Sequence, residues 1–233
     1  MIGEKLLARE AEVLKLLKTL GPERPYTLIG GYAVDAYSAL PRYSVDLDIV
    51  VAKPQLGQFA PLLEQGGFAD NEEPYMNEIE GVETRKFTKP VEDEQVSVDL
   101  LVGGVRCRQT EAVWKVGDIS ETAKVLRVVG VSDSAPARVA SRELLIALKL
   151  HSGRDPDLRD VVMLSADADW SVVRALGARG SKSKMKKQLE HAVEVLGEPD
   201  FEGRLKAYFS SRQNESARVR VAVTEIGRFL NRM

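Results

Sequence analysis

The stretch Tyr26-Thr27-Leu28-Ile29-Gly30-Gly31 is followed fifteen residues later by Asp46-Leu47-Asp48-Ile49-Val50-Val51. The residues before the two glycines are apolar and β-branched enough to form a strand, and residues 32–40 can form a helix. Gly30 and Gly31 are therefore expected at a strand-to-helix turn. Glycine allows the backbone to approach a ligand closely, and free N–H groups at a helix start favour an anion.

The second half of this stretch carries paired carboxylates. Side chains alternate between the two faces of a strand, so Asp46 and Asp48 share one face while Leu47 and Ile49 point into the core. Carboxylates about 7 Å apart on a strand repel each other unless a cation lies between them. Oxygen ligands of this kind suit Mg²⁺, which is usually held by one or two carboxylates and by substrate phosphates.

A third carboxylate that could complete such a site lies in the predicted strand from Gln95 to Val102. This strand contains Asp99, whereas the competing acids Asp93 and Asp118 do not lie in the middle of a strand. A Gly-Gly pair alone is common at turns, and an Asp-x-Asp alone is usually a solvated strand face. Their order and spacing, together with Asp99, favour a functional interpretation.

With these residues the chain resembles the nucleotidyltransferase superfamily, whose members are similar to DNA polymerase beta. The shared signature is a Gly-Gly or Gly-Ser turn, a helix, an acid-hydrophobic-acid strand and a third acid on a neighbouring strand. The resemblance is closest to the toxin-like nucleotidyltransferases of the abortive-infection type. It implies an α/β (α+β) fold in which a small mixed β-sheet core is followed by a helical C-terminal domain.

Further positions match the toxin-like group over roughly residues 25–165. Arg42-Tyr43-Ser44 precedes the paired acids, and Lys149 lies on a later, mostly apolar helix. The segment after that helix aligns Asp157 and Asp160 with the group's pattern, although Pro156 replaces its lysine. A structural role is also open for these acids, because Asp157 could cap the helix that follows.

The resemblance implies transfer of an NMP from an NTP to an acceptor hydroxyl, with release of pyrophosphate. Asp46, Asp48 and Asp99 would be the catalytic residues and would hold Mg²⁺ or Mn²⁺, with Asp99 also close enough to accept the proton of the attacking hydroxyl. The nucleotide's phosphates would contact a second set of residues: Gly30, Gly31, Arg42, Ser44 and Lys149. An exposed loop arginine such as Arg42 can equally be structural, and Lys149 can equally pair with an acid of the protein.

The composition fits a soluble globular protein of one large domain or two small ones. The chain has 233 residues, of which 44% are hydrophobic. A membrane span and a secretory h-region are both absent from the sequence, so we expect a cytoplasmic protein. The single Cys107 excludes an intramolecular disulfide and a cysteine metal cluster.

Charge is unevenly divided along the chain. Residues 179–233 contain twelve Lys and Arg against seven Asp and Glu, a net charge of +5, whereas residues 1–178 carry −7. Lysines gather at 182, 184, 186 and 187. This basic region would suit a polyanion such as tRNA, although a solvated helix face is the more ordinary explanation.

The order of predicted elements indicates two parts. We expect a nucleotidyltransferase catalytic domain at 1–132, with a helix over 4–20, and a helical C-terminal domain at 133–233. Within the first part, Thr84–Thr88 and Gln95–Val102 are expected to pair as antiparallel strands. In the second part, the first predicted helix covers Ala137–Ser152.

Three functions remain open from the sequence. The first is a toxin-like enzyme that modifies RNA, such as a tRNA 3′ end, or a protein, and that is neutralised by an antitoxin protein. The second is an antibiotic-modifying enzyme of the aminoglycoside or lincosamide type, which would need an acidic pocket for a cationic drug. The third is a non-catalytic nucleotide-binding module, which the presence of all three acids disfavours.

Overall fold

The fold consists of two compact units. The structure is a computed structural model that describes residues 2–38, 44, 46–71, 81–209 and 215–233. Unit 1 comprises Met1–Val105 and Trp114–Ser141, and unit 2 comprises Arg106–Val113 and Arg142–Met233. The chain therefore passes between the units three times.

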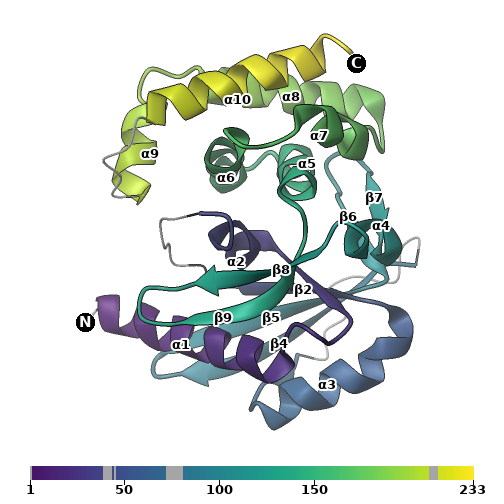
Figure 1. The fold of residues 1–233 in the computed structure, drawn as a ribbon, viewed down its shortest axis with the longest axis vertical. Helices are drawn as coiled ribbons and strands as arrows, with labels where there is room; N and C mark the ends of the chain where they lie inside the picture. The colour runs from purple at the N-terminus through teal and green to yellow at the C-terminus, as the bar shows by residue number, and fades with distance from the viewer. Residues whose placement is uncertain (1, 39–43, 45, 72–80, 210–214) are drawn as a thin grey trace. The chain divides into compact units, whose positions relative to one another are not determined.

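Unit 1 is built on a seven-stranded mixed sheet (Figure 1). In spatial order its strands are β3 (Ala69–Asp70), β4 (Glu83–Val91), β5 (Glu94–Val102), β2 (Asp46–Val51), β1 (Tyr26–Ile29), β9 (Ser134–Val139) and β8 (Lys124–Val129). β1 pairs antiparallel with β2 and parallel with β9, whereas β2 pairs parallel with β5. A separate two-stranded sheet consists of β6 (Gly104–Arg106) and β7 (Val113–Lys115). The central position of β2 places its acids between β1 and β5.

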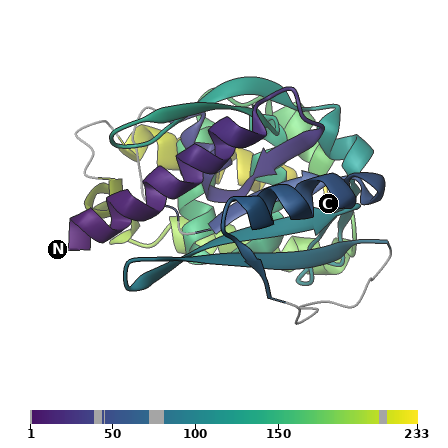
Figure 2. The ribbon, with the colours of Figure 1, turned by 90° about the horizontal axis from the view of Figure 1, so that it is seen from below.

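Helices cover both faces of the unit 1 sheet. α1 (Ile2–Leu20) and α3 (Leu56–Gln65) lie on one face and α2 (Gly30–Asp35) on the other, as Figures 1 and 2 show together. The 3₁₀ turn Lys53–Gln55 leads into α3, and α4 (Val116–Ser120) follows β7. α1 packs through leucines at helical spacing, and Val13, Leu14, Leu17 and Leu20 are fully or almost fully buried. Tyr26 of β1 meets Phe59 of α3 edge to face, with ring centroids 6.1 Å apart.

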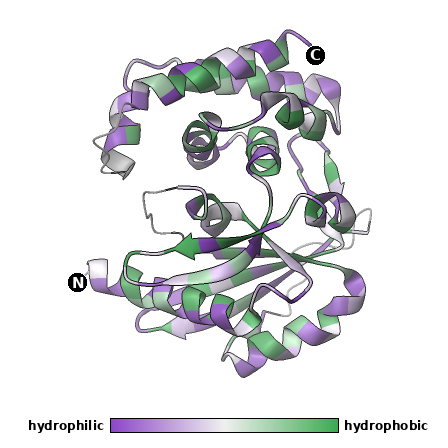
Figure 3. Ribbon diagram, in the orientation of Figure 1, coloured by the Kyte–Doolittle hydropathy of each residue, from purple (hydrophilic) through white to green (hydrophobic). Residues whose placement is uncertain are grey.

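Unit 2 is helical. Its helices are α5 (Arg142–Ser152), α6 (Asp155–Ser165), α7 (Trp170–Gly177), α8 (Lys182–Leu196), α9 (Phe201–Phe209) and α10 (Glu215–Leu230). α5 packs against α6, α7 and α8, and its Leu144, Ile146 and Leu150 are fully buried. Hydrophobic and hydrophilic residues alternate along α10, as expected for an amphipathic helix (Figure 3).

The expected α+β fold with a mixed sheet is confirmed. The β4–β5 hairpin contains the two strands predicted around the acidic turn, with Thr88 opposite Ser97. The helix predicted to begin at Ala137 is wrong in its first part, because residues 134–139 form β9. Ala135, Ala137 and Val139 are buried in alternation with less buried neighbours, which is the period of a strand. Small alanines and Pro136 concealed this alternation in the sequence.

Across the residues that the structure describes, no helix combines the length and the apolar character needed to cross a membrane.

His151 is a buried polar residue at the end of α5, in the core of unit 2. Its ring Nδ1 lies 2.6 Å from the Thr110 hydroxyl, and its Nε2 lies 2.9 Å from the Gly177 carbonyl. A neutral ring satisfies both contacts, because Nε2–H donates to the carbonyl and Nδ1 accepts from the hydroxyl. Burial lowers the pKa of His151 to about 4, although the Gly177 carbonyl opposes the shift.

Unit 2 should therefore lose stability in mild acid through His151. The unfolded chain takes up a proton near pH 6.5 and the folded chain only near pH 4, so stability decreases as the pH falls between these values. This residue should contribute roughly 3 kcal/mol to that loss. Denaturant unfolding at pH 4 to 7 should show a shallower pH dependence in His151→Gln than in the wild type.

The matched control is His191→Gln, since His191 is exposed on α8. It should keep the wild-type pH dependence. Equal pH dependence in His151→Gln and the wild type would contradict the assignment of a buried neutral ring.

Candidate functional site

The turn at Gly30 fits directly against the carboxylate of Asp48. Gly30 has a φ of +70°, a region that favours glycine, and it begins α2. A Cβ built on Gly30 would overlap Oδ2 of Asp48. The preceding residue, Ile29, is the register partner of Asp48. The glycine turn and the paired-acid strand are thus one structural element, as their order in the sequence predicted.

The parallel pairing of β2 and β5 gathers the acids. Asp48 is in register with Asp99, and Asp46 is in register with Ser97. Residues two apart on a strand, and register partners on neighbouring strands, have side chains on the same face. Asp46, Asp48 and Asp99 therefore lie on one face of the sheet, and all three are half-buried.

Two partners of these acids were not predicted from the sequence. The Ser97 hydroxyl donates a hydrogen bond to Oδ1 of Asp46. Lys86 of β4 is the register partner of Asp99, and its Nζ lies 3.9 Å from Oδ1 of that residue. Ser97 lies two residues before Asp99, so strand alternation could have predicted that Ser97 shares the face of the acids. Lys86 carried none, because its contact depends on how β4 pairs with β5.

Asp99 is electrostatically distinct within the site. Burial raises the pKa of Asp99, the charge of Lys86 opposes this increase, and the negative charge of Asp46 adds to it. Its carboxylate is therefore a better proton acceptor than a solvated aspartate, which suits a general base.

The three acids supply the donor chemistry that Mg²⁺ or Mn²⁺ prefers, because they present oxygen atoms on a rigid strand pair. Within the described part of the chain, however, no group of three or more His, Cys, Asp or Glu side chains is arranged to hold a metal ion. Asp46 already accepts from Ser97, and Asp48 lies against Gly30. Sites for Mg²⁺ usually combine one or two carboxylates with substrate phosphates, so the donor set fits such a site without forming a closed cage.

The segment before β2 is held by Tyr32. This tyrosine is buried, and its hydroxyl donates to the Ser44 carbonyl at 3.0 Å. The Ser44 hydroxyl lies 3.5 Å from the Asp46 carbonyl, which is a weak contact. Tyr32 thus packs in the core and contacts the backbone just before β2. Arg42 lies outside the residues that the structure describes, and phosphate contacts by Gly31 and Ser44 stay predictions.

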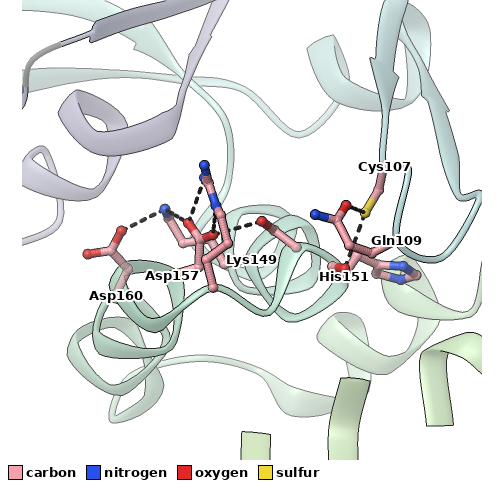
Figure 4. Close-up of polar contacts among 8 residues, drawn as sticks. Cys107, Gln109, Lys149, His151, Asp157 and Asp160 are labelled. Atoms are coloured by element: carbon pink, nitrogen blue, oxygen red, sulfur yellow. Dashed lines mark hydrogen bonds and ion pairs between the residues drawn. The ribbon is translucent and has the colours of Figure 1, made fainter. Parts of the chain in front are cut away.

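Lys149 belongs to a buried ion-pair cluster in unit 2 (Figure 4). Its Nζ lies 2.9 Å from Asp157 Oδ1 and 2.6 Å from Asp160 Oδ2. Asp157 also accepts from the Ser152 hydroxyl and from Arg154 Nε, both at 2.7 Å. Lys149 is 8% exposed, Asp157 3% and Asp160 2%. Both acids matched by resemblance therefore contact the lysine, and phosphate binding by Lys149 stays a prediction.

The charges in this cluster depend on one another. Burial alone would lower the pKa of Lys149, but the negative charges of Asp160 and Asp157 outweigh it, and the pKa is raised. Burial would raise the pKa of Asp157, but Lys149 and Arg154 hold it below its usual value. Asp157 lies in the first turn of α6, where Arg154 is the N-cap residue without a side-chain capping bond. Asp157 therefore forms ion pairs with Lys149 and Arg154 and does not act as the N-cap residue that the sequence suggested.

The other acids that competed with Asp99 have structural roles. Asp93, in the β4–β5 turn, pairs with Lys5 at 2.9 Å. Asp118 accepts a hydrogen bond from the backbone N–H of Lys115 at the start of α4. Neither lies on the face of β2 and β5 that carries the candidate site.

The lysines of the basic region lie on α8 and are exposed: Lys182, Lys184, Lys186 and Lys187. Lys184 pairs with Glu111 at 2.6 Å, and Lys186 pairs with Glu190 at 3.9 Å. Such exposed pairs are weak, so these lysines can exchange their partners for an external anion.

Comparison with known proteins identifies the fold. No family model matches the chain, and no curated protein matches it. Among solved structures, a candidate nucleotidyltransferase from H. pylori is 16% identical, with 98% of this chain and 96% of that chain covered and a TM-score of 0.54. JHP933 from Helicobacter pylori is 15% identical, with 98% and 93% covered and a TM-score of 0.54. The expected nucleotidyltransferase fold is thereby confirmed.

The antibiotic-resistance factor ANT(2'')-Ia is 17% identical, with 75% of this chain and 86% of that chain covered. Its TM-score is 0.45.

Gly30→Ala should damage both the turn and the position of Asp48. The substitution places a side chain at positive φ and forces its Cβ onto the Asp48 carboxylate, so we expect a loss of about 1–3 kcal/mol in unfolding free energy. Gly57→Ala on α3 is the matched control, because a Cβ there meets nothing within 4 Å. It should be neutral or stabilising by up to about 1 kcal/mol. Equal stability of the two variants in urea would contradict the described turn.

Lys149→Met should destabilise unit 2 strongly, because it leaves two buried carboxylates without their ammonium partner. We expect a loss of roughly 3–5 kcal/mol. Lys186→Met on α8 removes an exposed pair and should cost less than about 0.5 kcal/mol. Urea unfolding of both variants provides the measurement, and similar midpoints would show that the cluster contributes little to folding.

Proposed function

Because the chain has the nucleotidyltransferase fold, we propose that it is a metal-dependent enzyme that transfers an NMP from an NTP to an acceptor hydroxyl. One observation carries this proposal. The Gly30 turn lies directly against the Asp48 carboxylate, on a sheet face that Asp48 shares with Asp46 and Asp99. A turn without side chains beside three acids suits a triphosphate bound together with a divalent cation.

Each residue of this site has a proposed role. The triphosphate would lie against the Gly30-Gly31 backbone, where no Cβ obstructs its approach. Asp46, Asp48 and Asp99 would hold Mg²⁺ or Mn²⁺, which when bound would offset the negative charge of the reacting phosphate oxygens. Ser97 would keep the Asp46 carboxylate in a fixed orientation through its hydrogen bond.

Asp99 is the proposed acceptor of the proton that leaves the attacking hydroxyl. Its raised pKa supports this role, because a carboxylate binds a proton more readily as its pKa approaches the working pH. The positive charge of Lys86 opposes the increase in the pKa of Asp99 and so favours the ionised carboxylate that a base requires.

For the acceptor we propose RNA, with a tRNA 3′ end as the first candidate. The exposed lysines of α8 and the net charge of +5 over residues 179–233 support a polyanionic acceptor. The family resemblance also implies that the protein acts as a toxin and that an antitoxin protein neutralises it. This role stays a prediction.

The test is labelling with each α-³²P-NTP in the presence of Mg²⁺ and one acceptor pool: total tRNA, protein extract or an aminoglycoside panel. We expect the tRNA to be labelled. Asp46→Asn with Asp48→Asn should abolish labelling, and Asp99→Asn should reduce it by about 10²- to 10⁴-fold. Asp93→Asn in the exposed β4–β5 turn is the matched control and should retain full activity.

Each outcome decides a separate part of the proposal. If protein or an aminoglycoside is labelled and tRNA is not, the proposed nucleotidyl transfer stands and the proposed RNA acceptor is rejected. Undiminished labelling by the Asp46→Asn, Asp48→Asn variant would reject the site itself.

A further inference from the structure

A concave site lies in unit 1, at the opposite ends of β1 and β2 from the glycine turn. It is a pocket of about 420 Å³, within the size range of small-molecule sites. The first residue of β1, Tyr26, lines it, and so do Ala52 and Gln55, which follow β2. Because Tyr26 is three residues before Ile29, the register partner of Asp48, the pocket begins about 10 Å along the strands from the acids.

Two arginines, Arg24 and Arg138, line this pocket. Arg24 donates through Nη1 to the carbonyls of Thr19 and Leu20 at the end of α1, and Arg138 donates through Nη2 to the Ser120 carbonyl at 3.2 Å. In the chain as far as the structure describes it, neither guanidinium forms an ion pair. A guanidinium has five N–H donors, so each retains donors for a ligand.

The neighbouring polar groups are also mostly donors. Oε1 of Gln55 accepts from the Ala52 N–H at 3.0 Å, which leaves the amide NH₂ of this side chain for the pocket. Tyr26 is 2% exposed, and its hydroxyl lies against the Arg138 backbone. Among the described residues that line the pocket, Glu23 is the one acidic side chain, and it is exposed. The charged lining residues therefore sum to +1.

We propose that this pocket binds a small organic oxyanion, with its carboxylate or phosphate group between Arg24 and Arg138. Paired guanidinium groups recognise both anions through parallel N–H···O bonds. The body of the ligand would contact the apolar part of the lining, which includes Val50 and the Tyr26 ring. The site lies outside the proposed nucleotidyl-transfer site, so the ligand binds without a divalent cation.

The experiment measures binding by calorimetry and thermal shift with protein freed of metal by a chelating resin, which removes metal-dependent binding at the acids without adding a competing carboxylate. The probes are inorganic phosphate, citrate and 3-phosphoglycerate, which separate a phosphate from a carboxylate preference. At least one probe should bind the wild type with a Kd below 10 mM. The double variant Arg24→Gln, Arg138→Gln should weaken that binding at least tenfold. The double variant Arg24→Lys, Arg138→Lys keeps both positive charges and should retain part of the binding.

Two controls locate the effect. Asp46→Asn with Asp48→Asn should bind the probe as the wild type does, and so should Arg127→Gln, which removes an exposed arginine of β8. If the double Gln variant does not fold, the single Arg138→Met variant replaces it, with at least a threefold weaker Kd expected. Absence of binding by all probes, or equal Kd values in the arginine variants and the wild type, would overturn the proposal.

Discussion

The contact between the Gly30 backbone and the Asp48 carboxylate is the constraint on which the candidate site depends. A side chain at position 30 and the carboxylate at position 48 would occupy the same space, so only glycine allows β1, α2 and β2 to meet as they do. The positive φ of Gly30 requires glycine for a second, independent reason. One residue therefore sets both the direction of the turn and the position of Asp48.

From that contact the remaining geometry follows through strand register. β2 pairs with β1 on one side and with β5 on the other, so the acid held at the turn is also level with Asp99. Ser97 and Lys86 then tie the other two carboxylates to the sheet. The pocket beside Arg24 and Arg138 lies at the far ends of the same two strands. The central strands thus connect a site rich in acceptors with a pocket rich in donors.

Those parts of the site that rest on local periodicity could be predicted from the sequence. Strand alternation placed Asp46 and Asp48 on one face, the glycine pair marked the turn, and the position of Asp99 within a predicted strand made it the candidate third acid. Parts that rest on pairing between distant segments could not be predicted. Lys86 reaches Asp99 only because β4 pairs with β5 in one register, and the strand at 134–139 is stabilised by β1 and β8 despite its alanines and its proline.

Lys149 is a second residue whose partners could not be predicted from the sequence. Its place on an apolar helix predicted an anionic partner, but sequence spacing could not decide between a phosphate and an acid of the protein. The packing of α5 against α6 supplies Asp157 and Asp160. The buried lysine of unit 2 is therefore paired with two acids of the protein, whereas the lysines of α8 remain exposed to solvent. This contrast explains why net charge along the sequence identified a basic surface but not the buried cluster.

The most direct test of the central claim is where a divalent cation binds, measured by Mn²⁺-induced broadening of backbone amide NMR signals in the presence of a non-hydrolysable NTP analogue. The signals of Gly30, Gly31, Asp48 and Asp99 should broaden first at substoichiometric Mn²⁺, and Mg²⁺ should reverse the effect. The account would be contradicted if the signals of these residues stayed sharp and the broadening occurred instead at the acidic β4–β5 turn, Glu92-Asp93-Glu94.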